Sequence, residues 1–279
     1  MSRFVSASGV AVLGLAAMFG AMDALAAPSA STPDFSGAWV SDNEFGLHQP
    51  PSGPGPIGDL EGYLHVRRGV DAQGRDTPTT PWIGNYKSPM LTPWAANILK
   101  GEAENAIRTG KDPFWAASVC WPGGVPVVVW AEPSFFLQTP GEVTILYQRD
   151  HQVRHVYMNT PHTKNPKPSW YGESVGHYEG DTLVVDTIGF NDKTFVDRYG
   201  TPHSDKLHVV ERYRVLPDKK TLEGTLTFED PKAYTMKWSA SVKYHRTGAM
   251  AQESICAEDT FDFFTGKLFP IPVADGADF

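Results

Sequence analysis

The feature that most constrains this chain is a succession of short strand-like runs, which begins near Val125 and continues to Tyr244. In each run, apolar residues alternate with polar ones or follow one another directly, and turn-forming residues separate one run from the next. Successive short strands joined by short turns favour an antiparallel meander, either a closed barrel or a strongly curled sheet. We therefore predict a mainly β fold with strands at 127–131, 134–139, 143–149, 153–159, 174–178, 182–188, 207–216, 221–230 and 238–244.

The residues before this succession are mostly irregular. A first strand is predicted at 34–40, where the sequence DFSGAWV contains a Gly-x-Trp pair. Pro and Gly dominate residues 49–56, and we expect an irregular, loop-rich region over 41–124. One short helix is predicted over 93–109, because Thr92 can cap it, Pro93 suits its first position and Gly110 ends it.

The first residues have the pattern of a signal peptide. Arg3 supplies a positive charge, residues 5–20 are mostly apolar or small, and Ala24-Leu25-Ala26 matches a cleavage site. We predict a signal peptide at 1–26, a linker at 27–33 and a single β-rich domain at 34–279, and hence a periplasmic or secreted protein. An uncleaved N-terminal anchor is the alternative. No later segment is apolar for long enough to form a membrane-spanning helix.

The chain has two cysteines, Cys120 and Cys256. An even number of cysteines in an oxidising compartment suggests one disulfide, which would tie an early segment to the C-terminal end and stabilise the fold by roughly 2–5 kcal/mol. Two buried free thiols are the alternative. Neither cysteine belongs to a Cys-x-x-Cys pair, so thiol catalysis and a structural zinc site are not expected.

Composition and motifs argue against several classes of function. The formal net charge is −8 and the basic residues are scattered, so nucleic-acid binding is not expected. There is no GxGxxG or P-loop motif to indicate a nucleotide cofactor. No GxSxG elbow surrounds Ser204, and its neighbours His203 and Asp205 cannot complete a catalytic triad from adjacent positions. The aspartates between 181 and 197 lack the spacing of a calcium-binding loop.

Titratable residues gather between Trp170 and Tyr213, in a polar loop and in the strand that follows it. Alternation along this strand places Glu211 on the more apolar face and both His208 and Arg212 on the opposite face. A carboxylate on an apolar face either has the raised pKa that suits acid–base catalysis or forms a structural ion pair with an arginine of a neighbouring strand. Both readings of Glu211 remain open at this point.

The two histidines of this segment are candidate proton carriers. His203 lies in the loop that leads to the strand, and His208 lies within the strand. Imidazole is the usual proton carrier near neutral pH, so we predict His203, His208 and Glu211 as catalytic residues, with purely structural histidines as the alternative. The two histidines match no standard ligand spacing, although His155 or His162 could complete a metal site. We predict no cofactor and leave a metal as the weaker alternative.

A second group of residues could bind a substrate. Arg154 could hold a carboxylate, while Tyr157 and Trp170 could contact an aromatic ring. His162 lies in the Pro-rich loop before Trp170, and Arg212 follows Glu211 directly. We predict these five residues as substrate-binding, with ordinary surface positions as the alternative.

Four segments resemble the signatures of a large group of exported bacterial proteins of unassigned function. Residues 172–187 resemble its GxSxGxWEGDTLVVDT motif, with Tyr178 in place of the Trp, and residues 202–213 resemble PHSDxLHxxERF. Residues 230–235 resemble DPxxYT, and residues 34–39 are similar to DLSGxW. The resemblance implies export and a β-rich fold but no particular activity. In outline, the Gly-x-Trp start and the meander also resemble the lipocalins.

Three functions remain compatible with these observations. We favour an exported enzyme that acts on a small aromatic or apolar organic molecule by cofactor-free acid–base chemistry, of the lyase, isomerase or hydrolase type. The first alternative is a non-catalytic, lipocalin-like protein that binds a hydrophobic small molecule. The second is a structural envelope protein whose polar loops only satisfy one another.

Overall fold

The computed structural model describes residues 32–42, 46–63, 81–113, 116, 120–130, 133–149 and 151–253, together with two short strands at 261–262 and 267–268. These residues belong to one compact unit that begins at Thr32. The predicted signal peptide lies outside the described residues. Among the described residues, no helix is long and apolar enough to cross a membrane.

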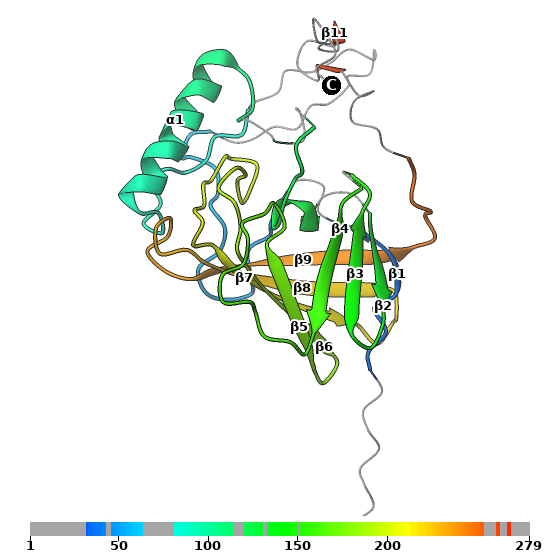
Figure 1. The fold of residues 1–279 in the computed structure, drawn as a ribbon. Helices are drawn as coiled ribbons and strands as arrows, with labels where there is room; N and C mark the ends of the chain where they lie inside the picture. Colours follow the sequence, from blue (N-terminus) through cyan, green and yellow to red (C-terminus); the bar gives the residue numbers. More distant parts are fainter. Residues whose placement is uncertain are drawn as a thin grey trace, which may run out of the picture. The chain divides into compact units, whose positions relative to one another are not determined.

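Nine strands form a closed barrel in which strands that follow one another in sequence are also neighbours in space (Figure 1). This architecture confirms the predicted β-rich barrel, and within the described residues one α-helix accompanies it, as predicted. A separate antiparallel pair is formed by β10 (Phe261–Asp262) and β11 (Lys267–Leu268). The barrel strands are β1 (Gly37–Ser41), β2 (Ser134–Gln138), β3 (Glu142–Tyr147), β4 (Val153–Met158), β5 (Glu173–Glu179), β6 (Thr182–Ile188), β7 (His208–Val215), β8 (Thr221–Glu229) and β9 (Trp238–Thr247).

The first strand closes the barrel. Trp39 of β1 pairs with Ser134 of β2 on one side and with Arg246 of β9 on the other. The Gly-x-Trp pair therefore marks the seam of the barrel, where the start of the domain meets the end of its last long strand. The Trp39 side chain is fully buried, and its indole nitrogen donates to the carbonyl of Phe35 at 2.8 Å.

One strand pair departs from the predicted antiparallel meander. β4 and β5 run parallel, with Val156 opposite Ser174 and Met158 opposite Gly176. A parallel neighbour requires a crossover of a dozen or more residues, because the chain must return along the strand before pairing again. Residues 159–172 make this return, and they carry the predicted site residues His162 and Trp170. The crossover thus places a polar loop over the outside of the barrel wall.

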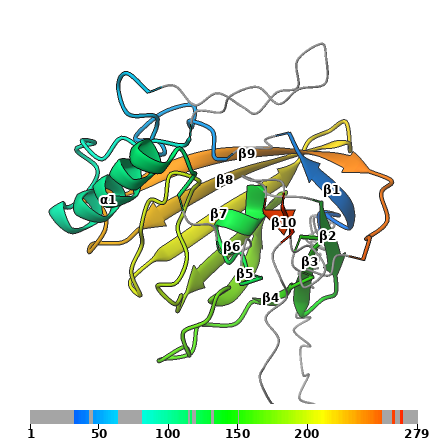
Figure 2. The ribbon, with the colours of Figure 1, turned by 90° about the horizontal axis from the view of Figure 1, so that it is seen from above.

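The helix α1 (Pro93–Thr109) has the predicted bounds and the predicted caps. The hydroxyl of Thr92 accepts from the amide of Ala95 at 3.4 Å, and Gly110 ends the helix in a left-handed conformation with φ 68°. The backbone amide of Thr92 also donates to the carbonyl of Ala233, which ties the start of the helix to the β8–β9 connection. In both views the helix lies outside the barrel (Figures 1 and 2).

The strand predicted at 127–131 was wrong: Val127–Trp130 forms a 3-10 helix, η2. The amides of Val128 and Val129 donate to the carbonyls of Gly124 and Pro126 in consecutive turns. A short apolar run does not distinguish a buried strand from a buried helical turn, and here the Gly and Pro before it favour the turn. The tyrosine hydroxyl of Tyr244 donates to the carbonyl of Val129 at 2.5 Å, which fastens the turn to β9.

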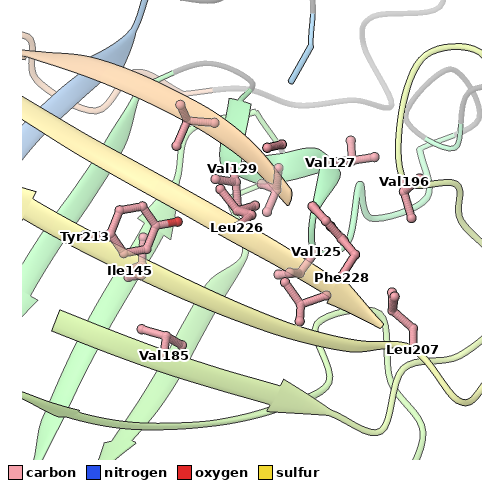
Figure 3. Packing of buried hydrophobic residues seen from close by; sticks show 14 of the residues in the cluster. Val125, Val127, Val129, Ile145, Val185, Val196, Leu207, Tyr213, Leu226 and Phe228 are labelled. Carbon is pink, nitrogen blue, oxygen red and sulfur yellow. The ribbon is translucent and has the colours of Figure 1, made fainter. Parts of the chain in front are cut away.

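The inward side chains of the strands and the valines of the 123–130 segment form one hydrophobic core. Figure 3 shows Val125, Val127 and Val129 beside Leu226 and Phe228 of β8. Burial of a large apolar side chain stabilises a fold by about 1.5–3 kcal/mol, so this core is the main source of stability. The predicted alternation of faces is confirmed in β7, where Val209 and Tyr213 point into the core and are fully buried.

The predicted disulfide stays a prediction. Cys120 is exposed at the surface and its backbone has a positive φ of 60°. Cys256 lies outside the described residues.

Gly224 of β8 is a position where the core leaves no room for a side chain. A Cβ atom there would lie 2.7 Å from Val242 and 2.8 Å from the ring of Tyr213, its partner on β7. We expect Gly224→Ala to lower the free energy of unfolding by roughly 1–3 kcal/mol because of overpacking. Chemical denaturation would measure the change. Gly101→Ala, in open space on α1, is the control and should stabilise by about 0.5–1 kcal/mol; equal effects of the two changes would contradict the packing described.

Candidate functional site

Two predicted site residues meet inside the barrel. Arg154 projects inward from β4 and Glu211 inward from β7, and their side chains form an ion pair that is 1% and 0% exposed. The guanidinium contacts the carboxylate through both of its terminal nitrogens, with Nη1 at 3.2 Å from Oε1 and Nη2 bonded to Oε2. A bidentate contact of this kind is the strongest geometry available to an Arg–carboxylate pair.

Hydroxyl groups complete the coordination of this buried ion pair. Arg154 donates from Nε to Ser174 at 2.9 Å, from Nη2 to Thr187 at 2.8 Å and from Nη1 to the hydroxyl of Tyr147 at 3.4 Å. Tyr213 donates to Glu211 Oε1 at 2.7 Å. All five N–H groups of the guanidinium therefore have acceptors within the barrel.

The electrostatics of the pair agree with a permanently charged arginine. Burial by itself opposes the charged guanidinium, but the attraction and hydrogen bond of Glu211, together with the nearby Tyr147 and Tyr213, outweigh it and raise the pKa of Arg154. Burial also raises the pKa of Tyr213 well above its ordinary value, and the adjacent Glu211 carboxylate adds to this effect. The hydroxyl thus remains a hydrogen-bond donor to the carboxylate.

Of the two alternatives for Glu211, this arrangement matches the structural ion pair with an arginine, but the arginine comes from an unexpected strand. The expected arginine of a neighbouring strand is replaced by one from across the barrel, since β7 pairs with β6 and β8 and not with β4. In this arrangement Arg154 has no N–H left for a substrate carboxylate, and Glu211 is occupied by three donors. Their predicted roles in substrate binding and catalysis would require this network to open.

A second cluster lies on the outer face of the barrel and joins two other predicted residues. Asp186 projects outward from β6, and its Oδ1 atom lies 2.9 Å from Nε2 of His208 and 2.9 Å from Nε2 of His162. His208 comes from the start of β7 and His162 from the β4–β5 crossover. We name Glu173, His162, Asp186 and His208 the histidine–carboxylate cluster.

Glu173 holds the crossover loop in this cluster. Its carboxylate accepts from the backbone amide of Thr163 at 2.7 Å, from the Thr163 hydroxyl at 2.9 Å and contacts Nδ1 of His162 at 3.1 Å. Both ring nitrogens of His162 therefore face carboxylates, and both contacts are hydrogen bonds only when each nitrogen carries a proton. The cluster is an unbroken row of alternating carboxylates and imidazoles.

The contacts within this row raise the pKa of a histidine and lower the pKa of a carboxylate. The hydrogen bond to Asp186 raises the pKa of His208, and this effect outweighs its partial burial. Partial burial would by itself raise the pKa of Asp186, yet the hydrogen bonds from His208 and His162 lower it. The side chains of His208 and Asp186 are 35% and 36% exposed, so both can be reached from solvent.

His203, the third predicted catalytic residue, lies apart from both groups. Its ring is buried, with Nδ1 3.1 Å from the carbonyl of Ser204 and Nε2 2.9 Å from the hydroxyl of Thr194. A carbonyl only accepts, so Nδ1 carries the proton and Nε2 accepts from Thr194. Burial lowers the pKa of His203, although the bond to Ser204 acts in the opposite direction. These contacts hold the ring of His203 within the loop between β6 and β7, and its predicted catalytic role stays a prediction.

The remaining predicted residues lie at the surface. Tyr157 is on the outer face of β4, 49% exposed, with its ring stacked on that of His155. Arg212 forms an exposed ion pair with Glu179 at 2.6 Å on the outer face of β5 and β7. Trp170 is half-buried beside Trp121. Neither Tyr157 nor Arg212 joins the histidine–carboxylate cluster.

The sequence did not reveal Asp186 and Glu173 as members of a site. In the sequence, Asp186 is one of several aspartates whose spacing does not match a calcium-binding loop. Alternation along β6 could have placed it outward, but only the register between β6 and β7 brings it to His208. No group of three or more ligating side chains within the described parts of the chain has the arrangement of a metal site.

Comparison of the chain with protein-family models, with curated proteins and with solved structures finds no match. The resemblance to exported proteins of unassigned function therefore stays a prediction. What the molecule does must be inferred from its own geometry.

The buried Arg154–Glu211 pair generates a prediction about stability. We expect Arg154→Met or Glu211→Gln to lower the free energy of unfolding by about 3–5 kcal/mol, because each leaves an unpaired charge or unmet donors in the core. The double variant should lose less than the sum of the two. Urea denaturation would measure all three. The exposed Arg212–Glu179 pair, changed in the same way, is the matched control and should lower the free energy of unfolding far less, because solvent screens an exposed ion pair.

A buried carboxylate in the β6–β7 loop, Asp197, should make the stability of the protein depend on pH. Asp197 is 5% exposed; its Oδ1 accepts from the amides of Tyr199 and Thr201, whereas its Oδ2 has no hydrogen-bond partner. Burial raises the pKa of Asp197 to about 6, against the opposing effect of these hydrogen bonds. The folded state therefore holds this proton more tightly than the unfolded state, and stability falls as the pH rises from about 4 through about 6.

Asp197→Asn should remove this pH-dependent loss. We expect the variant to exceed the parent in free energy of unfolding by at most about 3 kcal/mol at pH 7.5 and to differ little below pH 4. Denaturation at a series of pH values would show the difference, with the exposed Asp192→Asn as the control. An unchanged pH profile in Asp197→Asn would show that Asp197 does not titrate in this range.

Proposed function

We propose that the protein is an exported enzyme that acts on a small aromatic or apolar organic molecule by cofactor-free acid–base chemistry, with His208 as the proton carrier. The observation that carries the proposal is the 2.9 Å contact between His208 Nε2 and Asp186 Oδ1 at a site that solvent can reach. A carboxylate that fixes one nitrogen of an imidazole orients the ring and stabilises its charged form, as catalytic histidines require.

The contact also assigns the nitrogen that would exchange a proton with the substrate. Nε2 of His208 is engaged by Asp186, whereas Nδ1 lies 4.0 Å from Glu229, beyond hydrogen-bonding distance. Glu229 is itself paired with Lys237 at 2.6 Å. Nδ1 would therefore donate a proton to the leaving or rearranging group of a substrate and recover it afterwards.

The raised pKa of His208 favours the role of general acid. A larger fraction of the imidazole is then protonated near neutral pH, and the acid form persists to higher pH than in an isolated histidine. Activity that depends on this form should fall as the pH rises through the pKa of His208. Reactions that begin by protonating a leaving group, as in elimination, isomerisation or hydrolysis, fit this order of events.

The buried groups would have a supporting role in such an enzyme. Arg154 and Glu211 neutralise each other within the core, and His203 anchors the β6–β7 loop. The alternative of a lipocalin-like cup has less support, because the inward side chains of the strands and those of the 123–130 segment pack together in a single core.

The test is a screen of small aromatic compounds for elimination, isomerisation and hydrolysis, with products detected by mass spectrometry. We expect His208→Asn to reduce turnover by roughly 10²–10⁴-fold, the usual contribution of general acid–base catalysis. Asp186→Asn should lower the pKa of His208 and so move the loss of activity to lower pH. His155→Asn is the matched control, since His155 also pairs with a carboxylate, Glu142, on the outer face.

Two outcomes would contradict the proposal. Turnover that is unchanged in His208→Asn would exclude this residue as the proton carrier. Compounds that bind the protein without being converted would support the non-catalytic binding protein instead.

A further inference from the structure

One carboxylate oxygen on the outer face of the barrel contacts two histidines. The Oδ1 atom of Asp186 lies 2.9 Å from Nε2 of His208 and 2.9 Å from Nε2 of His162. The two nitrogens are therefore separated by at most twice this distance, and a charge on one imidazole opposes a charge on the other. The strength with which Asp186 attracts the proton of His208 thus depends on the protonation state of His162.

The doubly protonated form of His162 matches both of its neighbours. Nδ1 of His162 lies 3.1 Å from Oε1 of Glu173, while Nε2 faces Asp186. A neutral imidazole has only one N–H group, so one of the two carboxylates would then face the lone pair of a bare nitrogen. The charged ring instead donates to both carboxylates, and His162 completes a row in which negative and positive groups alternate.

The start of β5 keeps the crossover in this arrangement. Glu173, the first residue of β5, accepts from the backbone amide of Thr163 at 2.7 Å and from its hydroxyl at 2.9 Å. Burial by itself would raise the pKa of Glu173, but the bonds from Thr163 and His162 lower it, so this carboxylate keeps its charge near neutral pH. The residue next to His162 is therefore fixed to the sheet, and the imidazole lies between Glu173 and Asp186.

A separate ion pair lies on the other side of His208. Nδ1 of His208 is 4.0 Å from Oε2 of Glu229, and the same oxygen of Glu229 is 2.6 Å from Nζ of Lys237. Glu229 ends β8 and Lys237 directly precedes β9, so both residues lie outside the crossover. A substitution of His162 leaves this pair in place and acts on His208 from the side of Asp186.

From this geometry we propose that His162 is a positioning residue that sets how readily His208 releases its proton. When charged, His162 shares the Oδ1 atom of Asp186 with His208 and so weakens the net attraction that keeps the proton on His208. A general acid is most effective when its proton is held neither too weakly nor too tightly at the working pH. As the adjustment of a catalytic acid, this role rests on the proposed function, whereas the coupling between the two histidines requires no substrate.

The pKa of His208, measured by NMR in the full-length protein without any substrate, tests the coupling. The imidazole signals of His208 are identified by their loss in His208→Asn. We expect His162→Gln to raise the pKa of His208, because the glutamine amide can still donate to Asp186 but carries no charge. In the parent protein, the titration of His208 should also respond to that of His162, since two interacting groups titrate as a coupled pair.

A second variant separates the charge of His162 from its role in anchoring the crossover. His162→Lys removes the ring but keeps a positive charge, so the pKa of His208 should stay at or below that of the parent protein. If His162 only anchored the crossover, the lysine and glutamine variants would shift the pKa of His208 alike. His155→Gln is the matched control, because His155 also contacts a carboxylate on the outer face, Glu142 at 2.6 Å, and should leave the pKa of His208 unchanged.

The results separate this proposal from the proposed function. A pKa of His208 that is unchanged or lower in His162→Gln would overturn the coupling, as would a His162 ring that carries only one proton throughout the titration of His208. If His208 is the proton carrier, the loss of activity at high pH should move to higher pH in His162→Gln. A raised pKa without conversion of any compound would support the coupling and contradict the enzyme, whereas turnover that requires His208 at an unchanged pKa would do the reverse.

Discussion

The ion pair between Arg154 and Glu211 is the interaction on which the rest of the barrel depends. It joins β4 to β7 across the interior, and through Ser174 and Thr187 it also engages β5 and β6. Four successive strands therefore share one polar centre within an otherwise apolar core. Because each buried charge is costly unless its partner is in place, alternative registers of these strands would be penalised.

With these polar groups paired in the interior, the outer face of the barrel carries a separate cluster of titratable side chains. Asp186 and Thr187 are adjacent in β6, yet one faces solvent beside two histidines and the other faces Arg154. The wall of the barrel thus separates a permanently neutralised pair from a row of groups that can exchange protons. The crossover between β4 and β5 completes the outer row, since it brings His162 to Asp186 from beyond the sheet.

Local patterns in the sequence predicted the strands, the helix and the faces of β7, because these depend on alternation, capping and turn residues within a few positions. The burial of Glu211 followed from the same alternation. The partner of Glu211 could not be predicted, since Arg154 lies across the barrel and not on a paired strand. The contact between Asp186 and His208 could not be predicted either. The loop of residues 189–207 is long, so the sequence does not determine which residues of β6 and β7 lie opposite each other. The strand predicted at the valines of η2 was wrong because a continuous apolar run has neither the two-residue period of a strand nor the 3.6-residue period of a helix.

The closing strand β1 also has a consequence for how the chain acquires its structure. β1 must pair with β2 across a long intervening segment and with β9 near the end of the described chain, so its two contacts are among the most distant in the sequence. Until β1 docks, β2 and β9 are open edges with unpaired amides and carbonyls, which can recruit strands of other molecules. Closure is expected to come late and to be slow, because loop-closure entropy must be overcome before these contacts form. Docking of residues 37–41 therefore removes both open edges of the sheet. We expect these five residues to limit self-association of the chain during folding.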